Sequence, residues 1–236
     1  MQNSNNVPQS VGLIMDGNGR WMQKQGRSRL EGHTFGIVNM TRLTAHMLDR
    51  GVRNVVCYGL STENLKRPKP ELEHIYQLVI DMYDPFIEMM TQKRACVKFV
   101  GNLSALPESV QKSIARSEQR LSVYRDTGKC VYVGIAYGAR YEMVQAIQAL
   151  QEKEGLSEQS FLSELSVPVN LDLIIRTGGE YRLSNFMLYQ AAYAELYFSE
   201  KLFPEFTAQD VDDAFAWYAT RTRRFGRLQE QDPDNQ

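Results

Sequence analysis

The sequence predicts a single-domain α/β protein with a mostly parallel sheet. Short apolar, β-branched runs alternate with longer segments of helical periodicity, which is typical of strands joined by crossover helices. The length of 236 residues suits one such domain. No internal repeat, low-complexity linker or composition shift divides the chain, so we expect one domain over 11–228.

Composition narrows the classes of function. The 27 basic and 28 acidic side chains nearly cancel, so no global field favours nucleic acid or an anionic membrane surface. No segment approaches the roughly 20 apolar residues of a membrane span, and no signal peptide is evident. We therefore expect a cytoplasmic protein with a flexible polar N-terminus over 1–10 and a polar tail over 229–236. Cys57, Cys96 and Cys130 lie far apart in sequence, which predicts buried, reduced thiols.

The predicted elements follow from periodicity and boundary residues. Pro68 and Pro70 precede one helix, Gly51 follows another, and Thr207 with Asp210 caps the last. The predicted strands are 11–15, 54–59, 97–101, 131–136 and 171–175. The predicted helices are 31–50, 71–93, 108–124, 141–154, 186–194 and 207–224.

Glycine, arginine and small hydroxyl residues recur directly after four of the predicted strands. The four segments are Asp16-Gly17-Asn18-Gly19-Arg20, Ser61-Thr62-Glu63-Asn64 with Arg67, Tyr137-Gly138-Ala139-Arg140, and Arg176-Thr177-Gly178-Gly179-Glu180 with Arg182 and Ser184. Ligands of parallel sheets bind outside the carboxyl ends of the strands, and arginine matches phosphate oxygens with a fixed fork of donors. We therefore predict a phosphate-binding edge. A single arginine in such a loop is equally consistent with a solvated surface.

Two carboxylates and one histidine have competing interpretations. Asp16 is either a helix N-cap or a metal ligand, and the glycines at 17 and 19 favour a ligand because they let the backbone approach it closely. Glu195 interrupts an apolar run, so it needs a cation or hydrogen-bond donors, and a structural salt bridge is the default explanation. His33 alone is a weak signal, whereas His46 and His74 have no motif around them and are expected to be structural.

The helix predicted over 71–93 has an unusually wide apolar face. Its members are Leu72, Ile75, Tyr76, Val79, Met82, Tyr83, Phe86, Ile87 and Met90. Core packing is the default explanation. The alternative is that part of this face lines a hydrophobic cavity, which beside a phosphate-binding edge would suit an amphiphilic phosphorylated lipid.

Seven ordered motifs identify a family resemblance over 11–226. They are Met15-Asp16-Gly17-Asn18-Gly19-Arg20-Trp21, Gly32-His33, Ser61-Thr62-Glu63-Asn64 with Arg67-Pro68, Tyr137-Gly138-Ala139-Arg140, Arg176-Thr177-Gly178-Gly179-Glu180, Ala194-Glu195-Leu196-Tyr197-Phe198 and Arg223-Arg224-Phe225-Gly226. With them the chain resembles the cis-prenyltransferase (undecaprenyl diphosphate synthase) family. The resemblance implies a six-stranded parallel sheet with flanking helices, a hydrophobic tunnel and a homodimer.

The resemblance also implies a reaction and its residues. Isopentenyl diphosphate would be condensed onto an allylic diphosphate such as farnesyl diphosphate with a cis double bond, and the expected product is undecaprenyl diphosphate. Asp16 would position Mg²⁺, assisted by Glu195. The allylic diphosphate would be held by Gly17, Asn18, Gly19, Arg20, Arg29 and His33, and isopentenyl diphosphate by Arg176, Arg182 and Ser184. Further substrate contacts would come from Trp21, Ser61, Thr62, Glu63, Leu65, Arg67 and Leu183.

Asn64 occupies the position that the family assigns to the proton acceptor. A carboxamide is a very weak base, so a diphosphate oxygen or a water oriented by Asn64 is the better acceptor. The segment Arg224-Phe225-Gly226 resembles an element that reaches the partner subunit's site. A long product must leave for a bilayer, so transient membrane contact is expected.

Three positions depart from the family pattern and leave the product open. Leu65 stands where tryptophan is usual, Ala139 replaces a common glycine, and Ala136 stands where asparagine often precedes Tyr137. A short-chain or altered-product enzyme is therefore the alternative to a long-chain synthase. A third hypothesis is a non-catalytic, lipid-binding partner subunit, which the presence of Asp16, the arginines and Glu195 disfavours.

Overall fold

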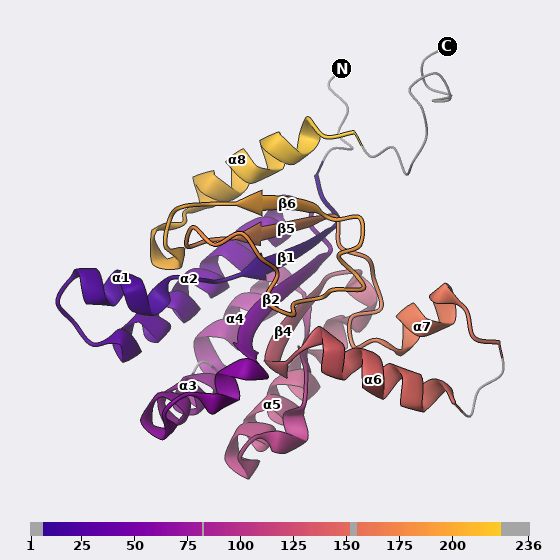
Figure 1. Cartoon of the computed structure of the whole chain (residues 1–236), viewed down its shortest axis with the longest axis horizontal. Helices are drawn as coiled ribbons and strands as arrows, with labels where there is room; N and C mark the ends of the chain where they lie inside the picture. The colour runs from indigo at the N-terminus through magenta and orange to yellow at the C-terminus, as the bar shows by residue number, and fades with distance from the viewer. Residues whose placement is uncertain (1–6, 82, 152–154, 223–236) are drawn as a thin grey trace.

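The computed structural model describes residues 7–81, 83–151 and 155–222, and its centre is a six-stranded, entirely parallel sheet (Figure 1). The strand order is β3-β4-β2-β1-β5-β6. The strands are β1 (Ser10–Ile14), β2 (Asn54–Ser61), β3 (Cys96–Val100), β4 (Cys130–Tyr137), β5 (Leu173–Arg176) and β6 (Glu195–Phe198). The predicted fold class, a mostly parallel sheet flanked by helices, is confirmed.

Helices cover both faces of the sheet, as a parallel sheet requires. The helices are α1 (Asn18–Lys24), α2 (Arg29–Asp49), α3 (Lys69–Asp81), α4 (Tyr83–Lys93), α5 (Glu108–Leu121), α6 (Ala139–Leu150), α7 (Glu158–Glu164) and α8 (Ala208–Ala219). One core packs Val55 and Cys57 against α2, α4, α5 and α8. Val56 points to the opposite face, into a second core with α6 and the segment 167–191. This alternation along β2 follows from the two-residue period of a strand.

Local sequence explains several boundaries. Ser28 accepts a hydrogen bond from the Leu30 N–H and forms a capping box with Glu31, which fixes the start of α2. Thr207 caps α8 in the same way with Asp210, as predicted.

The helix predicted over 71–93 is described as α3 and α4, which are both helical as predicted, and residue 82 between them lies outside the described residues. One helix prediction, over 186–194, is wrong.

The helix expected over 186–194 is a series of turns. Ser184, Asn185 and Met187 adopt positive φ angles of 51°, 64° and 44°, which a helix does not tolerate. The carbonyls of Asn185 and Gln190 accept from the distant N–H groups of Ala139 and Leu171, both at 2.8 Å, so tertiary bonds replace helical ones.

Short elements and chain ends complete the comparison. α1, α7 and β6 have seven, seven and four residues, and none was predicted from periodicity, which is a weak signal over so few residues. Within the described ranges, no helix is long and apolar enough to cross a membrane. The segments 223–226 and 229–236, to which the sequence assigns a partner-reaching element and a tail, lie outside the described residues, as do 1–6.

Candidate active site

The carboxyl ends of β1, β2 and β5 meet where the strand order reverses direction. The chain passes from β1 to β2 on one side, and β5 later pairs with the opposite side of β1. Such a reversal opens a crevice at the strand ends, where parallel sheets bind ligands. The crevice found there is lined by Ile14, Met15, Asp16, Asn18, His33, Tyr58, Gly59, Ser61, Glu63, Asn64, Arg67, Arg140, Arg176, Arg182, Ser184 and Asn185.

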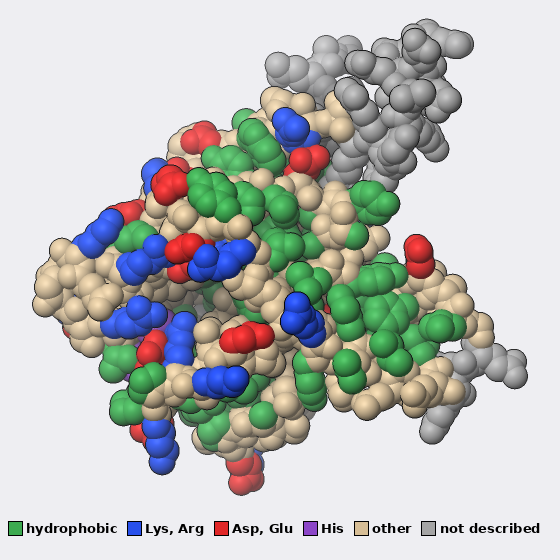
Figure 2. Space-filling model, in the orientation of Figure 1, with side chains coloured by type: hydrophobic (Ala, Val, Ile, Leu, Met, Phe, Trp, Pro, Cys, Tyr) green, Lys and Arg blue, Asp and Glu red, His purple; other side chains and the backbone are tan. Residues whose placement is uncertain are grey.

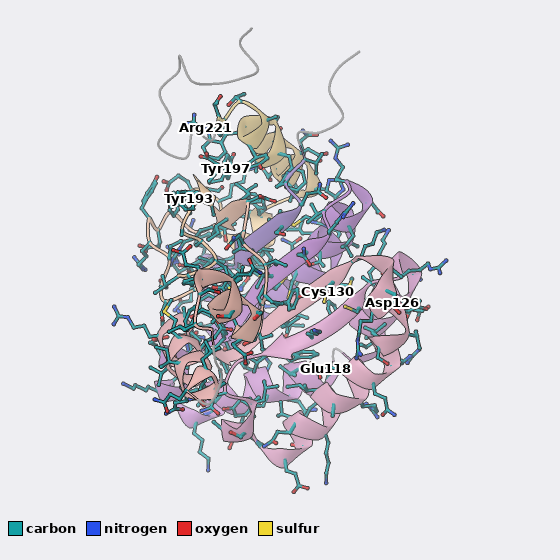
Figure 3. The ribbon with its side chains drawn as sticks, turned by 90° about the vertical axis from the view of Figure 1, so that its right-hand side faces the viewer. Glu118, Asp126, Cys130, Tyr193, Tyr197 and Arg221 are labelled. Atoms are coloured by element: carbon teal, nitrogen blue, oxygen red, sulfur yellow. The ribbon has the colours of Figure 1, made fainter. Side chains whose placement is uncertain are left out.

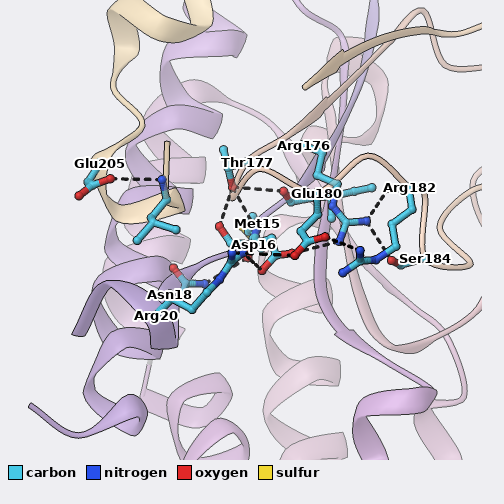
Figure 4. A network of polar contacts seen from close by, with 12 residues as sticks. Met15, Asp16, Asn18, Arg20, Arg176, Thr177, Glu180, Arg182, Ser184 and Glu205 are labelled. Carbon is cyan, nitrogen blue, oxygen red and sulfur yellow. Dashed lines mark hydrogen bonds and ion pairs between the residues drawn. The ribbon is translucent and has the colours of Figure 1, made fainter. Parts of the chain in front are cut away.

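Asp16 lies between two arginines (Figure 4). Its Oδ1 is 3.0 Å from Arg20 Nη2, and its Oδ2 is 3.0 Å from Arg176 Nη2. Thr177 holds the backbone, because its hydroxyl accepts from the Asp16 N–H at 3.1 Å and donates to the Asp16 carbonyl at 2.8 Å. The Asp16 side chain caps no helix: α1 begins after Gly17, which makes no side-chain cap. The N-cap interpretation of Asp16 is therefore wrong.

Arg176 is the most buried charged group of this crevice, with 4% of its side chain exposed. Its Nη1 donates to the Ser184 hydroxyl at 2.9 Å and to the Arg182 carbonyl, while Nη2 contacts Asp16. Its Nε is buried without a hydrogen-bond partner. A buried guanidinium with a free donor is a strong candidate for an anion ligand, because an unpaired buried polar group is costly.

The loop after β5 packs closely against the loop after β1, at Arg20 and Asp16. Gly178 adopts a φ of +89°, and a Cβ there would lie 2.6 Å from Arg20 Nη2 and 3.1 Å from the Asp16 backbone. The Glu180 carboxylate pairs with Arg182 and lies 4.0 Å from Arg20 Nη1. The loops after β1 and β5 therefore form one cluster of alternating charges.

A second cluster centres on Glu71, a residue that the sequence did not single out. Its Oε1 accepts from Arg67 Nη1 at 3.0 Å and lies 3.2 Å from His33 Nε2 and 3.5 Å from Arg29 Nε. Burial alone would raise the pKa of the Glu71 carboxyl, but Arg67, His33 and Arg29 outweigh it and hold that pKa below its usual value. Its position four residues after Arg67, in the first turn of α3, was the available signal.

Glu71 also sets the protonation of His33. Burial lowers the pKa of His33 below its ordinary value, and the hydrogen bond that the His33 ring makes to the Glu71 carboxylate opposes that shift. We expect Glu71→Gln to lower the pKa of His33 further, because the opposing negative charge is lost. Titration of His33 by NMR checks this, with Glu73→Gln, an exposed neighbour paired only at 3.9 Å with Lys69, as the matched control. An unchanged or raised His33 pKa in the Glu71 variant would contradict the expectation.

The segment after β2 forms a compact turn. The Asn64 N–H donates to the Ser61 hydroxyl at 3.1 Å, and the Asn64 side-chain oxygen accepts from the Ser61 N–H at 3.4 Å. The Thr62 N–H donates to the Tyr137 carbonyl, which attaches this turn to β4. Glu63 accepts from the Asn185 amide at 3.0 Å, so this turn also contacts the loop that carries Ser184.

Asn18 joins the polar crevice to an apolar cavity. Its Oδ1 is buried without a partner, and its amide donates to the Met15 carbonyl at 3.3 Å. Gly36 leaves the space for this side chain, since a Cβ there would lie 2.5 Å from Asn18 Oδ1. The cavity runs between the sheet and the helices α2 to α5, and it shares Met15, Asn18, His33 and Gly59 with the crevice. Its other lining residues are Gly36, Ile37, Met40, Ile75, Leu78, Val79, Phe86, Phe99, Ser117, Val133 and Ile135.

The apolar face predicted over 71–93 serves both expected purposes, because part of it lines the cavity and part of it packs in the core. Ile75, Val79 and Phe86 line the cavity, whereas Ile87 and Met90 are fully buried in the core. Gly59 lies where the register between β2 and β4 shifts, and a Cβ there would lie 2.9 Å from Ile135 Cδ1 and 3.1 Å from the Gly134 carbonyl. Where the crevice joins the cavity, β2 therefore contributes only the main chain of Gly59.

Of the predicted substrate-binding residues, eight are not part of the crevice lining: Gly17, Gly19, Arg20, Trp21, Arg29, Thr62, Leu65 and Leu183. Trp21 packs edge-on against Phe35 at 5.1 Å, Leu65 packs against the first core, and Leu183 against the second. Gly17 is packed closely against Leu202, and Gly19 against the Arg29 side chain. A side chain at either glycine would clash with that neighbour. The roles of these residues as substrate contacts stay predictions.

Glu195 does not join Asp16 within one chain. It begins β6 and is the register partner of Leu173, the first residue of β5, so it lies at the amino edge of the sheet. Asp16 follows the carboxyl end of β1. Glu195 instead pairs with Arg221 at 3.6 Å, which is the salt-bridge alternative.

The residues around Asp16 suit Mg²⁺ held jointly with a ligand. Within the described ranges, no group of three or more acidic, histidine or cysteine side chains forms a metal cage. Mg²⁺ usually takes only one or two protein carboxylates and completes its shell with phosphate oxygens and water. Asp16 is partly exposed and lies among arginines that can bind phosphate, so it can supply the single protein carboxylate of such a Mg²⁺ site.

Comparison with known proteins agrees with this geometry. A family model described as putative undecaprenyl diphosphate synthase matches residues 14–226. An isoprenyl transferase from Thermotoga maritima is 38% identical over 94% of this chain and 98% of its own. A ditrans,polycis-undecaprenyl-diphosphate synthase, (2E,6E)-farnesyl-diphosphate specific, from Shewanella oneidensis is 36% identical over 93% of this chain and 83% of its own.

Solved structures show the same fold. Lavandulyl diphosphate synthase from Lavandula x intermedia, in complex with dimethylallyl diphosphate, superposes with a TM-score of 0.87 at 30% identity, covering 94% of this chain and 99% of its own. A probable undecaprenyl diphosphate synthase from Campylobacter jejuni gives a TM-score of 0.80 at 32% identity, covering 93% and 99%.

Proposed function

Because this chain belongs to the undecaprenyl diphosphate synthase family of prenyltransferases, we propose that it condenses isopentenyl diphosphate onto an allylic diphosphate such as farnesyl diphosphate. The proposed product is a Z-polyprenyl diphosphate, with undecaprenyl diphosphate as the specific candidate. The observation that carries this proposal is the junction of an arginine-lined crevice with an apolar cavity through Met15, Asn18, His33 and Gly59. A ligand with a diphosphate head and a hydrocarbon tail fits both compartments.

Each half of the crevice has donors for one diphosphate. Arg20, Arg29 and His33, with the backbone N–H groups of 17–19, would bind the allylic diphosphate at the end of β1. Arg176, Arg182 and Ser184 would bind isopentenyl diphosphate at the end of β5. Since Arg20 and Arg176 both contact Asp16 at 3.0 Å, the two diphosphates would lie next to each other. This arrangement would bring the isopentenyl alkene close to the allylic carbon.

Departure of the allylic diphosphate leaves a carbocation and a strongly negative leaving group. The fixed arginine donors would stabilise that negative charge without reorganisation. We propose Mg²⁺ as the cofactor at Asp16, where it would supply further neutralisation of the leaving diphosphate. The isopentenyl alkene then attacks the allylic carbon, and loss of a proton from the new tertiary cation completes the double bond.

The proton leaves to an oxygen rather than to Asn64. A carboxamide is too weak a base for that role, whereas a diphosphate oxygen or a water bound in the crevice can accept a proton. Asn64 is held by reciprocal hydrogen bonds with Ser61, so its amide is positioned to orient such an acceptor.

The test is incubation of the purified protein with farnesyl diphosphate, radiolabelled isopentenyl diphosphate and Mg²⁺, followed by separation of the extracted lipids by chain length. Labelled C55 lipid supports the undecaprenyl assignment, and short labelled lipid supports the alternative of an altered product. When Mg²⁺ is left out of the assay and a chelator is added, no labelled lipid should form. No labelled lipid from folded protein would contradict the proposed activity and would favour the non-catalytic partner subunit.

Leu65 is the position most suited to a test of product length. Leu65 packs against the first core beside the crevice, in the turn that holds Asn64. We expect Leu65→Trp to fill space near the first isoprene units and to change the distribution of chain lengths. The same labelled-lipid separation measures it, with Leu156→Trp, an exposed position far along the sequence, as the control. An unchanged distribution would exclude a role for Leu65 in product length.

A homodimer is the proposed assembly. Tyr141, Val144 and Ile147 recur on one face of α6 and are exposed by 38%, 52% and 52%. Figure 2 shows apolar side chains gathered over α6. A contiguous exposed apolar surface is typical of an interaction site. Sedimentation of the whole protein tests this assembly, and transient membrane contact is proposed only for release of a long product.

A further inference from the structure

We propose that Cys96 and Cys130 form a redox-modification site, at which a low-molecular-weight disulfide oxidises the two thiols to a disulfide between β3 and β4. Neither cysteine belongs to the crevice or the cavity described above. The proposal is independent of the prenyltransferase reaction.

The backbone places the two thiols together. Cys96 and Cys130 each begin their strand and are direct register partners in the parallel pair. Register partners point to the same face of a sheet, and neighbouring strands lie about 4.8 Å apart, which is within the Cα separation that disulfides span. The two Sγ atoms are 2.7 Å apart. A disulfide therefore needs no change in strand pairing.

Cys96 is the thiol suited to react first. It is 6% exposed and lines a surface pocket with Lys98, Glu118 and Arg125, whereas Cys130 does not line that pocket. The contact with Cys130 and the nearby charges of Lys98 and Arg125 lower the pKa of Cys96, against the opposing effect of burial. The same contact and burial raise the pKa of Cys130. Cys96 is accordingly the nucleophile and Cys130 the resolving thiol.

The exchange balances in two steps. The Cys96 thiolate attacks one sulfur of the oxidant, forms a mixed disulfide and expels the first small thiolate. Cys130 then loses its proton to solvent, and its sulfur attacks Cys96 Sγ, which expels the second small thiolate. The protein loses two electrons and two protons, and the oxidant is reduced to two thiols.

The site is remote from the proposed chemistry. Cys96 and Cys130 belong to the core on one face of the sheet, whereas Val133, on the same strand as Cys130, lines the cavity on the other face. Figure 3 shows Cys130 on the side of the sheet near Asp126, away from Tyr193, Tyr197 and Arg221. A disulfide here would link two residues 34 positions apart and restrict the unfolded chain. Oxidation should therefore raise the midpoint of thermal unfolding by about several degrees. Prenyl transfer should be unchanged.

The experiment uses the full chain, folded and reduced, which is treated with oxidised glutathione; the free thiols are then counted after denaturation. Of the three cysteines, we expect two to be lost, with a mass two hydrogen atoms lighter and a linked peptide containing Cys96 and Cys130. Cys57→Ser is the matched control, because Cys57 is fully buried beside Thr44, and this variant should still form the disulfide.

Single variants separate the two roles. Cys130→Ser should trap the glutathione adduct on Cys96, and Cys96→Ser should give neither adduct nor disulfide. Three free thiols in the treated, folded wild-type protein would overturn the proposal. A glutathione adduct that accumulates on wild-type Cys96 without closure would overturn it as well, because it would show that Cys130 does not resolve it.

Discussion

Asp16→Asn is expected to lower kcat by about a thousandfold, the loss typical of removing one preorganised charge-stabilising group. Asparagine keeps the size of the side chain but removes the charge that pairs with Arg20 and Arg176 at 3.0 Å. It also removes the carboxylate proposed to hold Mg²⁺. The measurement is turnover of labelled isopentenyl diphosphate at saturating farnesyl diphosphate.

The control for Asp16 separates chemistry from folding. Asp126→Asn changes an exposed aspartate between α5 and β4, away from the crevice, and should leave kcat unchanged. Circular dichroism and binding of farnesyl diphosphate should show that the Asp16 variant is folded and still takes its substrate. Wild-type turnover by a folded Asp16→Asn protein would exclude the proposed role of this carboxylate.

Arg176→Lys is expected to raise the KM for isopentenyl diphosphate by about a hundredfold, which corresponds to about 2.7 kcal/mol in binding. The Arg176 guanidinium contacts Asp16 through one nitrogen and Ser184 through another, and it is 4% exposed. A lysine has one point charge and cannot make both contacts while it binds a phosphate. Steady-state kinetics with each substrate varied in turn measure the effect.

The two substrates should respond differently to the Arg176 change. The KM for farnesyl diphosphate should move much less, because Arg20 pairs with the other carboxylate oxygen of Asp16, and Arg29 and His33 belong to the cluster around Glu71. Arg53→Lys, at an exposed position before β2, is the matched control. Equal increases in both KM values would argue that Arg176 acts through general structure rather than at one diphosphate.

Periodicity and strand-end residues predicted the sheet and the crevice because parallel strands present their carboxyl ends at a common edge. The five predicted strands all exist, and the loops that contain Asp16, Asn64 and Arg176 meet as expected. Gly51 and Pro68 also marked helix boundaries correctly, because α2 ends at Asp49 and α3 begins at Lys69.

Sequence reasoning did not find contacts that depend on the packing of separate elements. Glu71 looked like an ordinary acidic residue of a helix N-terminus, and only the packing of α2 against α3 brings Arg29 and His33 to it. The 186–194 segment has helical composition, yet a long-range hydrogen bond from the Leu171 N–H takes the Gln190 carbonyl, and one from the Ala139 N–H takes the carbonyl of Asn185 just before the segment. The position of Glu195 at one edge of the sheet follows from the register of β6, which four residues do not reveal.

The close approach of β2 and β4 at Gly59 has a consequence for the width of the passage between the two compartments. Side chains at a narrow point change rotamer on the picosecond to nanosecond scale, so a passage that they border opens and narrows continually. Gly59 itself has no side chain, so β2 contributes only main chain at this position, and the side chain nearest to it is Ile135 of β4. Rotamers of Ile135 therefore change the width available to a passing hydrocarbon on this side, whereas any side chain at position 59 would reduce that width permanently.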